Sequence, residues 1–449
     1  MKIIALEKYR LRKLTGEVIA AQRTVQEIIT AVRARGDAAL KQFSRRYDKV
    51  VPQSFLVPED DIGIAVKNCA PDLRQAIRLA ITNLRCFARR QKKQYRDFNL
   101  RIRAGVTAGQ RVLPIERIGV YVPGGRFPLF SSLLMAVVPA QVAGVSEIAV
   151  CSPSDAQGLV HPATLAAAGL LGISEVYCLG GAQAIAAMAF GSETVRAVDK
   201  IVGPGNLYVS LAKLAVFGQV GIDLPAGPSE IVILADDSAR PEFLAADLLA
   251  QAEHDPLAVT LLVTTSPGLA SAVQAEVKKQ LQQLPATSPA HRSIASHGVI
   301  LLTDSLEVAI AFINKRAPEH LELQIVKANS LVKRFTAFGS LFIGPYAVEA
   351  LGDYSSGLNH ILPTAGAARF SGGLSVRDFL RLATTLQVDA AGLRHIGPTA
   401  QLLAEAENLT AHAHSLKLRL SDLKFAGFWS EKKNDEISNK NSLRKNLNT

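Results

Sequence analysis

The fold is decided from Arg117-Ile-Gly-Val-Tyr-Val-Pro-Gly-Gly125 onward, where helical periodicity gives way to short apolar runs that end in glycine or proline. Ala- and Leu-rich segments of helical length separate these runs, which are Ile118–Val122, Glu147–Cys151, Glu175–Leu179 and Lys200–Val202. Short apolar runs between turn residues are typical of buried strands. Strands that alternate with helices predict βαβ units and a mostly parallel sheet.

A second series of the same kind follows, with expected strands at Glu230–Leu234, Ala258–Val263, Gly298–Leu302 and Ser340–Ile343. Between the first two of them we expect a helix from Arg240 to His254, with Ser238 as its cap and Pro241 in its first turn. Upstream, residues 24–96 show helical periodicity with few breakers. We predict an α/β protein with two doubly wound, incomplete Rossmann-like parallel-sheet domains and small helical arms at both ends.

The composition describes a large globular protein with excess positive charge. The chain has 449 residues, 48% of them hydrophobic, and a formal net charge of +11. No apolar run is long enough to span a bilayer, and the first residues lack the apolar core and cleavage site of a signal peptide. We therefore expect a cytoplasmic protein with no membrane partner.

Part of the positive charge is concentrated between Arg85 and Arg103, a segment whose one acidic residue is Asp97. A basic stripe attracts phosphate, which leaves a nucleic-acid-binding protein as an alternative. No nucleic-acid-binding motif accompanies the segment, so we favour a solvated helix face or a contact with an acidic partner, and no nucleic acid. The polar tail, residues 430–449, lacks apolar periodicity and is expected to be disordered.

Three glycine-rich turns close strands of the first series: Val122-Pro-Gly-Gly125, Gly180-Gly-Ala-Gln183 and Gly203-Pro-Gly-Asn206. Each follows an expected strand and precedes an expected helix, where backbone amides and a helix N-terminus can hold a phosphate. The chain contains no G-x-G-x-x-G fingerprint. Ordinary tight connections between strand and helix therefore remain the alternative to nucleotide binding.

A candidate metal site begins at the end of the helix expected at residues 240–254. Gln251 and His254 are three residues apart, so both side chains can lie on one helix face and reach one ion. A metal site also needs an anion, and borderline ions such as zinc accept nitrogen and oxygen ligands together. Asp353, in a loop rich in Gly and Ser, is the candidate carboxylate, although such an Asp can equally cap a turn.

Glu319 and His320 form a candidate acid–base pair after Pro318, because both side chains can move protons near neutral pH. Adjacent residues of an extended segment point in opposite directions, so we expect the pair to serve different protons. A solvated Glu beside a packed His is the alternative. Further along, His412 and His414 cannot both face one ion on a helix, and their spacing does not choose between them.

Seven segments, in order, resemble the histidinol dehydrogenase family across about residues 20 to 425. They are Gly119–Gly125, Gly180–Ile185, Lys200–Asn206, Ala226–Glu230, Asp247–His254, Ala317–Glu322 and Gly352–Arg369. Enzymes of this family oxidise L-histidinol to L-histidinal and then to L-histidine, consuming two NAD per substrate, in the last steps of histidine biosynthesis. The resemblance implies the same activity here.

The resemblance also implies roles for individual residues. The ligands of one Zn²⁺ per subunit correspond to Gln251, His254, Asp353 and His412, which selects His412 over His414. The acid–base pair corresponds to Glu319 and His320, and the NAD contacts correspond to Tyr121, Gln183 and Asn206. Substrate contacts correspond to Ser229, His360 and Glu407, together with the metal ligands and His320. The family forms a homodimer of intertwined subunits, which implies that His412 completes the active site of the partner chain.

The domain organisation expected with these roles has five parts. Residues 1–20 form an N-terminal arm, residues 21–120 and 230–372 a discontinuous metal-binding catalytic domain, and residues 121–229 the NAD-binding domain. Residues 373–429 form a C-terminal arm that reaches the partner's active site, and residues 430–449 the disordered basic tail. A related zinc- and NAD-dependent dehydrogenase of another small alcohol remains the alternative. His360 and Glu407 favour histidinol, because they suit an imidazole and an amine.

Overall fold

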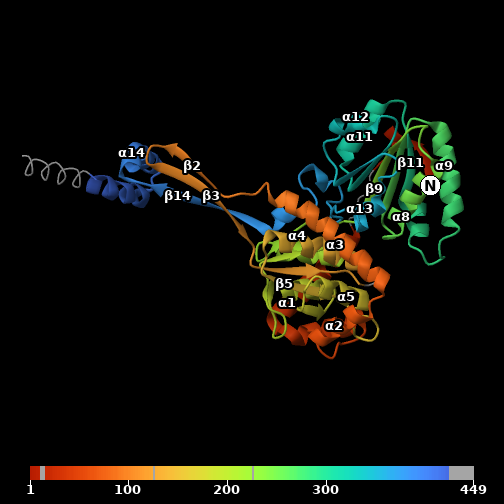
Figure 1. Cartoon of the computed structure of the whole chain (residues 1–449), viewed down its shortest axis with the longest axis horizontal. Helices are drawn as coiled ribbons and strands as arrows, with labels where there is room; N and C mark the ends of the chain where they lie inside the picture. The colour runs from red at the N-terminus through yellow and green to blue at the C-terminus, as the bar shows by residue number, and fades with distance from the viewer. Residues whose placement is uncertain (11–15, 125–126, 225–226, 424–449) are drawn as a thin grey trace, which may run out of the picture. The chain divides into compact units, whose positions relative to one another are not determined.

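The computed structural model describes residues 1–10, 16–124, 127–224 and 227–423. The chain divides into a large unit, residues 1–94 and 114–380, and a small unit, residues 95–113 and 381–449. The large unit contains two parallel sheets and the small unit a third sheet (Figure 1). The predicted disordered tail, together with Gly125 and Ala226 of the quoted motifs, lies outside the described residues.

The first sheet has five parallel strands in the order β6-β5-β4-β7-β8. These are β4 (Arg117–Tyr121), β5 (Glu147–Ser152), β6 (Val176–Cys178), β7 (Lys200–Val202) and β8 (Gly221–Ile222). One face packs against α2 (Glu59–Asn68), α3 (Pro71–Lys92), α4 (Phe130–Ala143) and α5 (Pro162–Leu170), and the other against α1 (Gly16–Phe43), α6 (Gly181–Phe190) and α7 (Leu207–Val216). The strand order reverses between β4 and β7, and ligands of such sheets bind outside the carboxyl ends of the strands at this point.

The second sheet has six parallel strands in the order β1-β11-β10-β9-β12-β13. These are β1 (Lys2–Ala5), β9 (Glu230–Ala235), β10 (Val259–Thr264), β11 (Gly298–Leu302), β12 (His320–Gln324) and β13 (Ser340–Ile343). One face packs against α8 (Pro241–Ala252), α9 (Pro267–Leu281) and α10 (Ala290–His297), and the other against α11 (Leu306–Arg316) and α12 (Ala328–Leu331). Because both faces of β9 are covered, all its residues are buried and its sequence is apolar without alternation after Glu230.

These two sheets confirm the predicted fold class of two doubly wound parallel-sheet domains. The expected helix after β9 is present but shorter than predicted, since α8 ends at Ala252 and His254 lies in the turn beyond it. The predicted cap was wrong. The N-cap is Arg240, while the Ser238 hydroxyl bonds to the Asp236 carboxylate two residues earlier and so cannot reach the helix.

The ends of the large unit differ from the expected domains. The predicted N-terminal helical arm contains β1, which pairs with β11 as an edge strand of the second sheet. Helices α1, α2 and α3 pack against α6, α5 and α4 respectively, so they cover the first sheet rather than the second. A helical segment without a strand of its own carries no local signal for the sheet that it covers, which explains why residues 21–94 were grouped with the catalytic domain.

The small unit contains a three-stranded sheet in the order β14-β3-β2. Its elements are β2 (Phe98–Arg103), β3 (Val106–Pro114), β14 (Leu380–Val388), α14 (Ala390–Ala406) and a helix at residues 410–423. The expected C-terminal arm therefore also includes residues 95–113, which had been assigned to the catalytic domain. Strand β2, Phe-Asn-Leu-Arg-Ile-Arg, alternates apolar and polar residues, a strand signal that was missed because Arg85–Arg103 was interpreted as one basic helix face.

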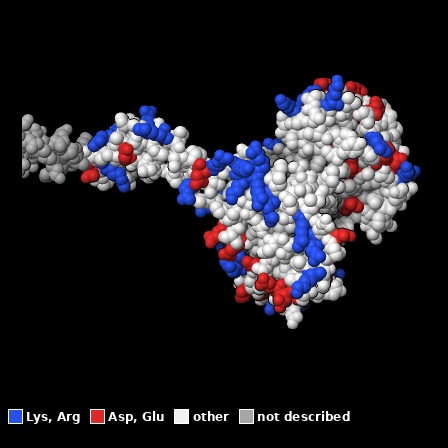
Figure 2. Space-filling view, in the orientation of Figure 1, with Lys and Arg blue, Asp and Glu red and all other residues white. Residues whose placement is uncertain are grey.

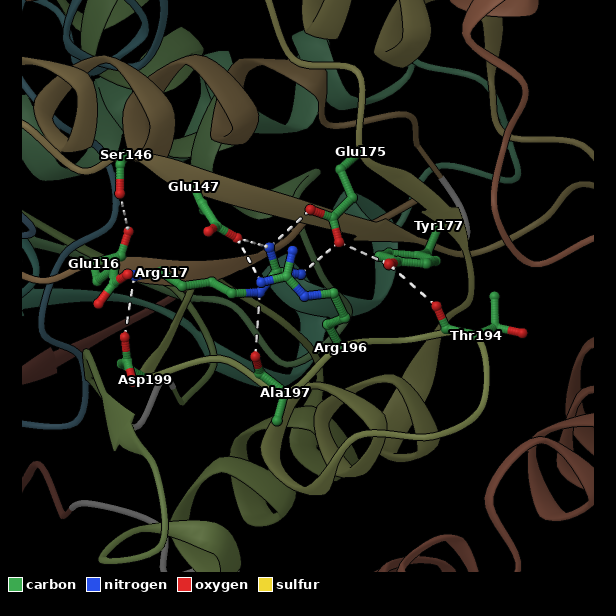
Figure 3. Close-up of polar contacts among 10 residues, drawn as sticks. All are labelled: Glu116, Arg117, Ser146, Glu147, Glu175, Tyr177, Thr194, Arg196, Ala197 and Asp199. Atoms are coloured by element: carbon green, nitrogen blue, oxygen red, sulfur yellow. Dashed lines mark hydrogen bonds and ion pairs between the residues drawn. The ribbon is translucent and has the colours of Figure 1, made fainter.

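A charged network around Arg117, the first residue of β4, joins the amino ends of strands β4, β5 and β6 in the first sheet. Its guanidinium lies between two carboxylates, 2.8 Å from Glu147 and 2.9 Å from Glu175 (Figure 3). It also donates to the backbone carbonyl of Ala197 at 3.2 Å. Although burial acts in the opposite direction, the hydrogen bonds from Arg117 hold the pKa of Glu175 below its usual value. The buried charge of Arg117 is thus compensated by the carboxylates of Glu147 and Glu175.

Among the residues that the structure describes, no helix has both the length and the apolar character required to cross a membrane.

Candidate active site

The three predicted NAD contacts lie at the carboxyl edge of the first sheet. Tyr121 is the last residue of β4, and its hydroxyl accepts a hydrogen bond from the Gly181 amide at 3.1 Å. Gln183 is in the first turn of α6, and Asn206 caps α7 by accepting from the amides of Tyr208 and Val209 at 3.0 and 3.1 Å. The cap leaves the amide nitrogen of Asn206 available to a ligand.

A glycine is required at the turn between β7 and α7. Gly203 has φ 116°, and a Cβ atom there would lie 2.1 Å from the carbonyl oxygen of Tyr121. The buried Lys213 ammonium, which pairs with Asp223, donates to the Gly203 carbonyl at 2.9 Å, and the Asp223 carboxylate accepts from the Gly203 amide at 2.7 Å. This turn is therefore held rigidly against the end of β4.

The candidate metal ligands converge in the large unit. His254, Glu349 and Asp353 each offer one ligand atom, and these atoms all lie within 4.8 Å of one another. His254 Nε2 is 3.8 Å from the Asp353 carboxylate. Two carboxylates and an imidazole fit zinc or a similar divalent ion, because their oxygen and nitrogen donors supply both the ligands and the compensating charge.

Glu349 is a candidate metal-site residue that the sequence reasoning missed. It is the first residue of α13 (Glu349–Tyr354), so it lies four residues before Asp353 on the same face of that helix. With its side-chain amide oriented to donate, Gln251 bonds through its nitrogen to the Glu349 carboxylate at 2.6 Å. This leaves the Gln251 oxygen as an acceptor for a cation. The i,i+4 pair of acids was the signal that could have identified Glu349.

Buried carboxyl groups surround this site without an equal number of cations. Burial raises the pKa of Asp353 and of Asp247 to about 6. It also raises the pKa values of Glu322 and Glu349 well above the usual range, and the neighbouring acids act in the same direction. A bound divalent cation would offset this concentration of negative charge.

Glu319 and His320 are buried where β12 begins, and both are held by the backbone of Glu230, the first residue of β9. The Glu230 amide donates to the Glu319 carboxylate at 2.8 Å. His320 Nδ1 lies 3.3 Å from the Glu230 carbonyl and 3.5 Å from the Glu349 carboxylate, and because both groups only accept, we assign the ring proton to Nδ1. The Gln251 nitrogen, 3.2 Å from the same atom, then donates to Glu349 and not to the ring. The unprotonated Nε2 atom is buried and has no hydrogen-bond partner among the described residues.

The pair therefore has the properties of a proton-transfer site. Burial lowers the pKa of His320 to about 3, which keeps the ring neutral, and burial raises the pKa of Glu319 well above its usual value. The expectation that the two side chains point apart was wrong, because Glu319 Oε2 and His320 Nδ1 come within 3.8 Å. The long Glu side chain folds back toward the ring in order to reach the Glu230 amide.

The predicted substrate contact His360 also lies in the large unit. Its Nδ1 atom donates to the backbone carbonyl of Asp353 at 2.9 Å, and its Nε2 atom lies 3.1 Å from the Ser132 hydroxyl. Burial lowers the pKa of His360 to about 4, so the ring is neutral and Nε2 accepts. Ser229 directly precedes β9 and is half-buried, with its carbonyl accepting from Val259 at 3.0 Å.

The remaining predicted residues, Glu407 and His412, belong to the small unit. Glu407 is the C-cap residue that follows α14, and His412 is in the helix at residues 410–423. Both side chains are exposed within the chain. Within the large unit, the structure brings Gln251, His254 and Asp353 together near Glu319 and His320.

Two doubly wound sheets, one ending in glycine turns and the other bordering a buried proton-transfer pair, place the chain in the class of α/β oxidoreductases. The family model for histidinol dehydrogenase matches residues 12–420. A histidinol dehydrogenase of Parasynechococcus marenigrum (strain WH8102) is 45% identical over 416 residues, which cover 93% of this chain and 95% of that protein. Another from Geobacillus kaustophilus (strain HTA426) is 46% identical over 399 residues, which cover 89% and 94%.

The fold agrees with this assignment. The crystal structure of histidinol dehydrogenase from Elizabethkingia anophelis has a TM-score of 0.87 and 39% sequence identity, and the match covers 94% of this chain and 99% of that one. The chain belongs to the histidinol dehydrogenase family. It is therefore an oxidoreductase whose family is consistent with histidinol oxidation in histidine biosynthesis.

Proposed function

We propose that the protein oxidises L-histidinol through L-histidinal to L-histidine, with NAD as oxidant and one zinc ion per subunit. The observation that carries the proposal is the buried Glu319–His320 pair beside the converging donors of His254, Glu349 and Asp353. Bound NAD would accept a hydride in each oxidation, and bound zinc would orient the imidazole and amino nitrogens of the substrate. A cytoplasmic location stays a prediction from the sequence.

In the first oxidation, His320 acts as the general base. Its Nε2 atom is unprotonated, buried and without a partner among the described residues, so its lone pair can accept the hydroxyl proton of the alcohol as the hydride leaves the same carbon. The hydrogen bond from Nδ1 to the Glu230 carbonyl fixes the ring orientation and stabilises the charged ring that forms. The products of this step are the aldehyde, a proton on His320 and one NADH.

The second oxidation requires that water add to the aldehyde, and Glu319 is the candidate base for that water. Its raised pKa makes it a stronger base than an exposed carboxylate, while the Glu230 amide holds one of its oxygens in place. As Glu319 takes a proton from the water, His320 returns its proton to the aldehyde oxygen, so the hydrate forms and the ring is neutral again. The hydrate then loses a second hydride, and His320 accepts its hydroxyl proton. The net change per histidinol is one water and two NAD consumed, with two NADH, two protons and the acid formed.

Gln251, His254 and Asp353 are the residues of the large unit that would hold the zinc ion, with His412 of the partner subunit as the fourth ligand. Glu349 would support the site by accepting from the Gln251 nitrogen, which leaves the Gln251 oxygen available to the ion. Holding the substrate by its nitrogens also retains the reactive aldehyde between the two oxidations.

A homodimer with shared active sites is part of this proposal. The small unit exposes large apolar side chains on β2 and on its helices, including Phe98, Leu100, Ile102, Leu402 and Leu403. An exposed apolar surface of this kind marks a protein contact, and an intertwined partner would cover it. Mixing a His412→Ala variant with a His254→Ala variant should then restore part of the activity, because one of the hybrid sites is intact. Subunit exchange without any recovery would show that His412 serves its own chain.

The nucleic-acid alternative rests on the basic segment at Arg85–Arg103. Figure 2 shows Lys and Arg side chains gathered over α3, and three of them, Arg85, Arg89 and Lys92, line an open cavity of about 520 Å³. The Lys92 ammonium donates to the carbonyl of Ala143, the last residue of α4, at 2.9 Å. Basic side chains at helix C-termini offset the negative end of the helix dipole. This supports a structural role for the segment.

NADH formation with L-histidinol tests the proposal. The metal-replete enzyme should form NADH, and a strong chelator should abolish the rate until zinc is restored. L-Leucinol, an amino alcohol without the imidazole, is the control that separates histidinol from other small alcohols. Absence of NADH with metal-replete enzyme and L-histidinol would contradict the proposal, and a higher rate with L-leucinol would favour a related dehydrogenase.

A further inference from the structure

Asp48 lies beside two of the predicted NAD contacts, although it comes from a distant part of the sequence. Its carboxylate accepts a hydrogen bond from Gln183 Nε2 at 3.5 Å. Its charge also acts on Tyr121, whose pKa is raised to about 12 by burial and, to a smaller degree, by Asp48. Asp48 thus belongs to the carboxyl edge of the first sheet.

The backbone that presents Asp48 is unusual. Asp48 ends a π-helical turn, Ser44–Asp48, that continues directly from α1. The next residue, Lys49, has φ 61°, a left-handed conformation that is strained for a residue other than glycine. Single π-helical turns and strained residues of this kind cluster at functional sites, because the rest of the fold must hold them in place.

Neighbouring contacts hold this segment against the first sheet. Helix α1 packs against α6 and α7. Further along, the Phe55 carbonyl accepts from the Cys178 amide at 2.7 Å, and the Val57 amide donates to the Val176 carbonyl at 2.9 Å. Residues 44–57 therefore start and end on elements of the first sheet, and the position of Asp48 is fixed at its edge.

The Asp48 carboxylate has unused capacity to accept hydrogen bonds. It is half-buried and accepts hydrogen bonds from Gln183 and from Ser44 of its own turn, whereas an ionised carboxylate can accept about four. The nearby Asp155 carboxylate accepts from the amides of its own loop, Gln157 and Leu159, at 2.9 and 3.0 Å, and Asp223 is paired with Lys213. In dinucleotide-binding sheets a carboxylate accepts the 2′-hydroxyl of the adenosine ribose and repels the 2′-phosphate of NADP.

We propose that Asp48 accepts the adenosine 2′-hydroxyl of NAD and thereby makes the enzyme select NAD over NADP. This inference rests on the proposed use of a nicotinamide dinucleotide. Burial raises the pKa of Asp48 to about 6, so the carboxylate is ionised in an assay at about pH 8 and can act by charge. In the usual dinucleotide-binding sheet, the acidic residue follows the G-x-G-x-x-G turn in the sequence. This chain has no such turn, and Asp48 comes before the first strand of the sheet, β4.

The test uses the full-length, metal-replete enzyme and its variants Asp48→Asn and Asp48→Ala. We would measure kcat/KM for NAD, for NADP and for an NAD analogue that lacks the adenosine 2′-hydroxyl, with L-histidinol at saturation. Asp48→Asn keeps the shape and removes the charge, and thermal unfolding checks that it folds. Asp155→Asn is the matched control, because that carboxylate lies near the same edge but is occupied by its own loop.

The proposal makes three linked expectations. The wild type should lose about tenfold in kcat/KM on the analogue, the scale of one hydrogen bond to a charged group. Asp48→Ala should lose about tenfold on NAD but nothing further on the analogue. The NADP to NAD preference should rise about tenfold in Asp48→Asn and stay unchanged in Asp155→Asn.

Two results would overturn the inference in distinguishable ways. Equal losses on NAD and on the analogue in Asp48→Ala, with an unchanged preference in Asp48→Asn, would mean that Asp48 only positions Gln183. That result would leave the proposed function intact, because the wild type would still turn over NAD. No turnover of NAD by the wild type would overturn the proposed function, and this inference with it.

Discussion

The amino edges of the two parallel sheets both gather buried charged residues and both include a paired arginine, Arg117 in the first and Arg316 with Glu230 in the second. The second edge also holds buried carboxyl groups, those of Glu349 and Asp353, that no Lys or Arg among the described residues pairs with. In the first sheet, Arg117 is almost fully buried and lies between Glu147 and Glu175. In the second sheet, Glu319 and His320 begin β12 next to the carboxyl groups of Glu349 and Asp353, and burial shifts the pKa values of all four. Matched charges stabilise a fold, whereas buried groups with displaced pKa values are available for chemistry and for a metal ion.

The comparison also separates the two edges of the first sheet. Its carboxyl edge presents glycine turns and the predicted NAD contacts, as expected for a doubly wound sheet. The proton-transfer pair of the second sheet lies instead at the amino ends of β9 and β12. Under the proposed function, NAD binding and acid–base chemistry would therefore use opposite strand ends in the two sheets.

The largest expected effect is on the Glu319–His320 pair. Replacing His320 by Asn should lower kcat for both oxidations by about 100- to 10,000-fold, because the unprotonated Nε2 atom is lost. Replacing Glu319 by Gln should slow the oxidation of L-histidinal much more than that of L-histidinol, because only the aldehyde step needs activated water. Rapid mixing with each substrate measures the two steps separately. Comparable losses in both steps for Glu319→Gln would contradict its assigned role.

For Arg117→Met, in the charged network of the first sheet, we predict a loss of stability and not of activity. Removing the guanidinium leaves Glu147 and Glu175, both partly exposed, without their cation. We expect a loss of about 2–3 kcal/mol in unfolding free energy, discounted for the exposure of the partners, with KM values within about twofold. Thermal unfolding and steady-state kinetics check this. An Arg117→Met variant with unchanged stability and lost activity would contradict a structural role for this edge of the first sheet.

The uncompensated acids of the second sheet predict that one neutral replacement stabilises the protein. The folded pKa of Asp247, about 6, lies above its ordinary value of 3.8, so the ionised form penalises folding. The penalty is present at pH values above 6 and disappears as the pH falls toward the ordinary value. Asp247→Asn should therefore raise the unfolding free energy by about 2 kcal/mol at high pH and by almost nothing near the ordinary pKa. A gain that does not change with pH would mean that the effect is not electrostatic.

The smallest expected effect concerns the carboxyl edge of the first sheet. In Gly203→Ala the added Cβ would meet the Tyr121 carbonyl, and φ 116° is strained for alanine. We expect the KM for NAD to rise about tenfold, with little change in the KM for L-histidinol. Gly218→Ala is the matched control, because that glycine also has a positive φ but an added Cβ would meet nothing within 4 Å. Equal effects of both variants would show that backbone strain, and not contact with Tyr121, is responsible.

The sequence predicted most of the two sheets because their strands are apolar runs bounded by turn residues. Lys200–Val202, Gly298–Leu302 and Ser340–Ile343 have the bounds that were expected. Strand β12 was missed because it contains His320 and Glu322, and buried charged residues hide a strand from any reading of hydrophobicity. Strand β1 and the pairing of β2 with β14 through β3 depend on contacts between distant parts of the chain, which local patterns do not encode.

The candidate site was predicted in part. His254 and Asp353 converge with Glu349, to which Gln251 bonds, and the roles of Gln251, His254 and Asp353 as ligands stay predictions. The convergence of Glu319 with His320, and the role of the Glu230 backbone in holding both, depend on the register of β9 against β12 and could not be derived from the order of residues. Glu349 carried a signal in its spacing from Asp353, but two acids four residues apart are equally typical of a solvated helix face.

The central claim is that the amino edge of the second sheet performs two successive oxidations on one bound substrate. The most direct test is the number of NADH molecules formed per L-histidinol consumed by the metal-replete enzyme, with the product identified by chromatography. The account predicts two NADH and L-histidine, without free L-histidinal in solution. One NADH per L-histidinol with accumulation of the aldehyde would contradict it.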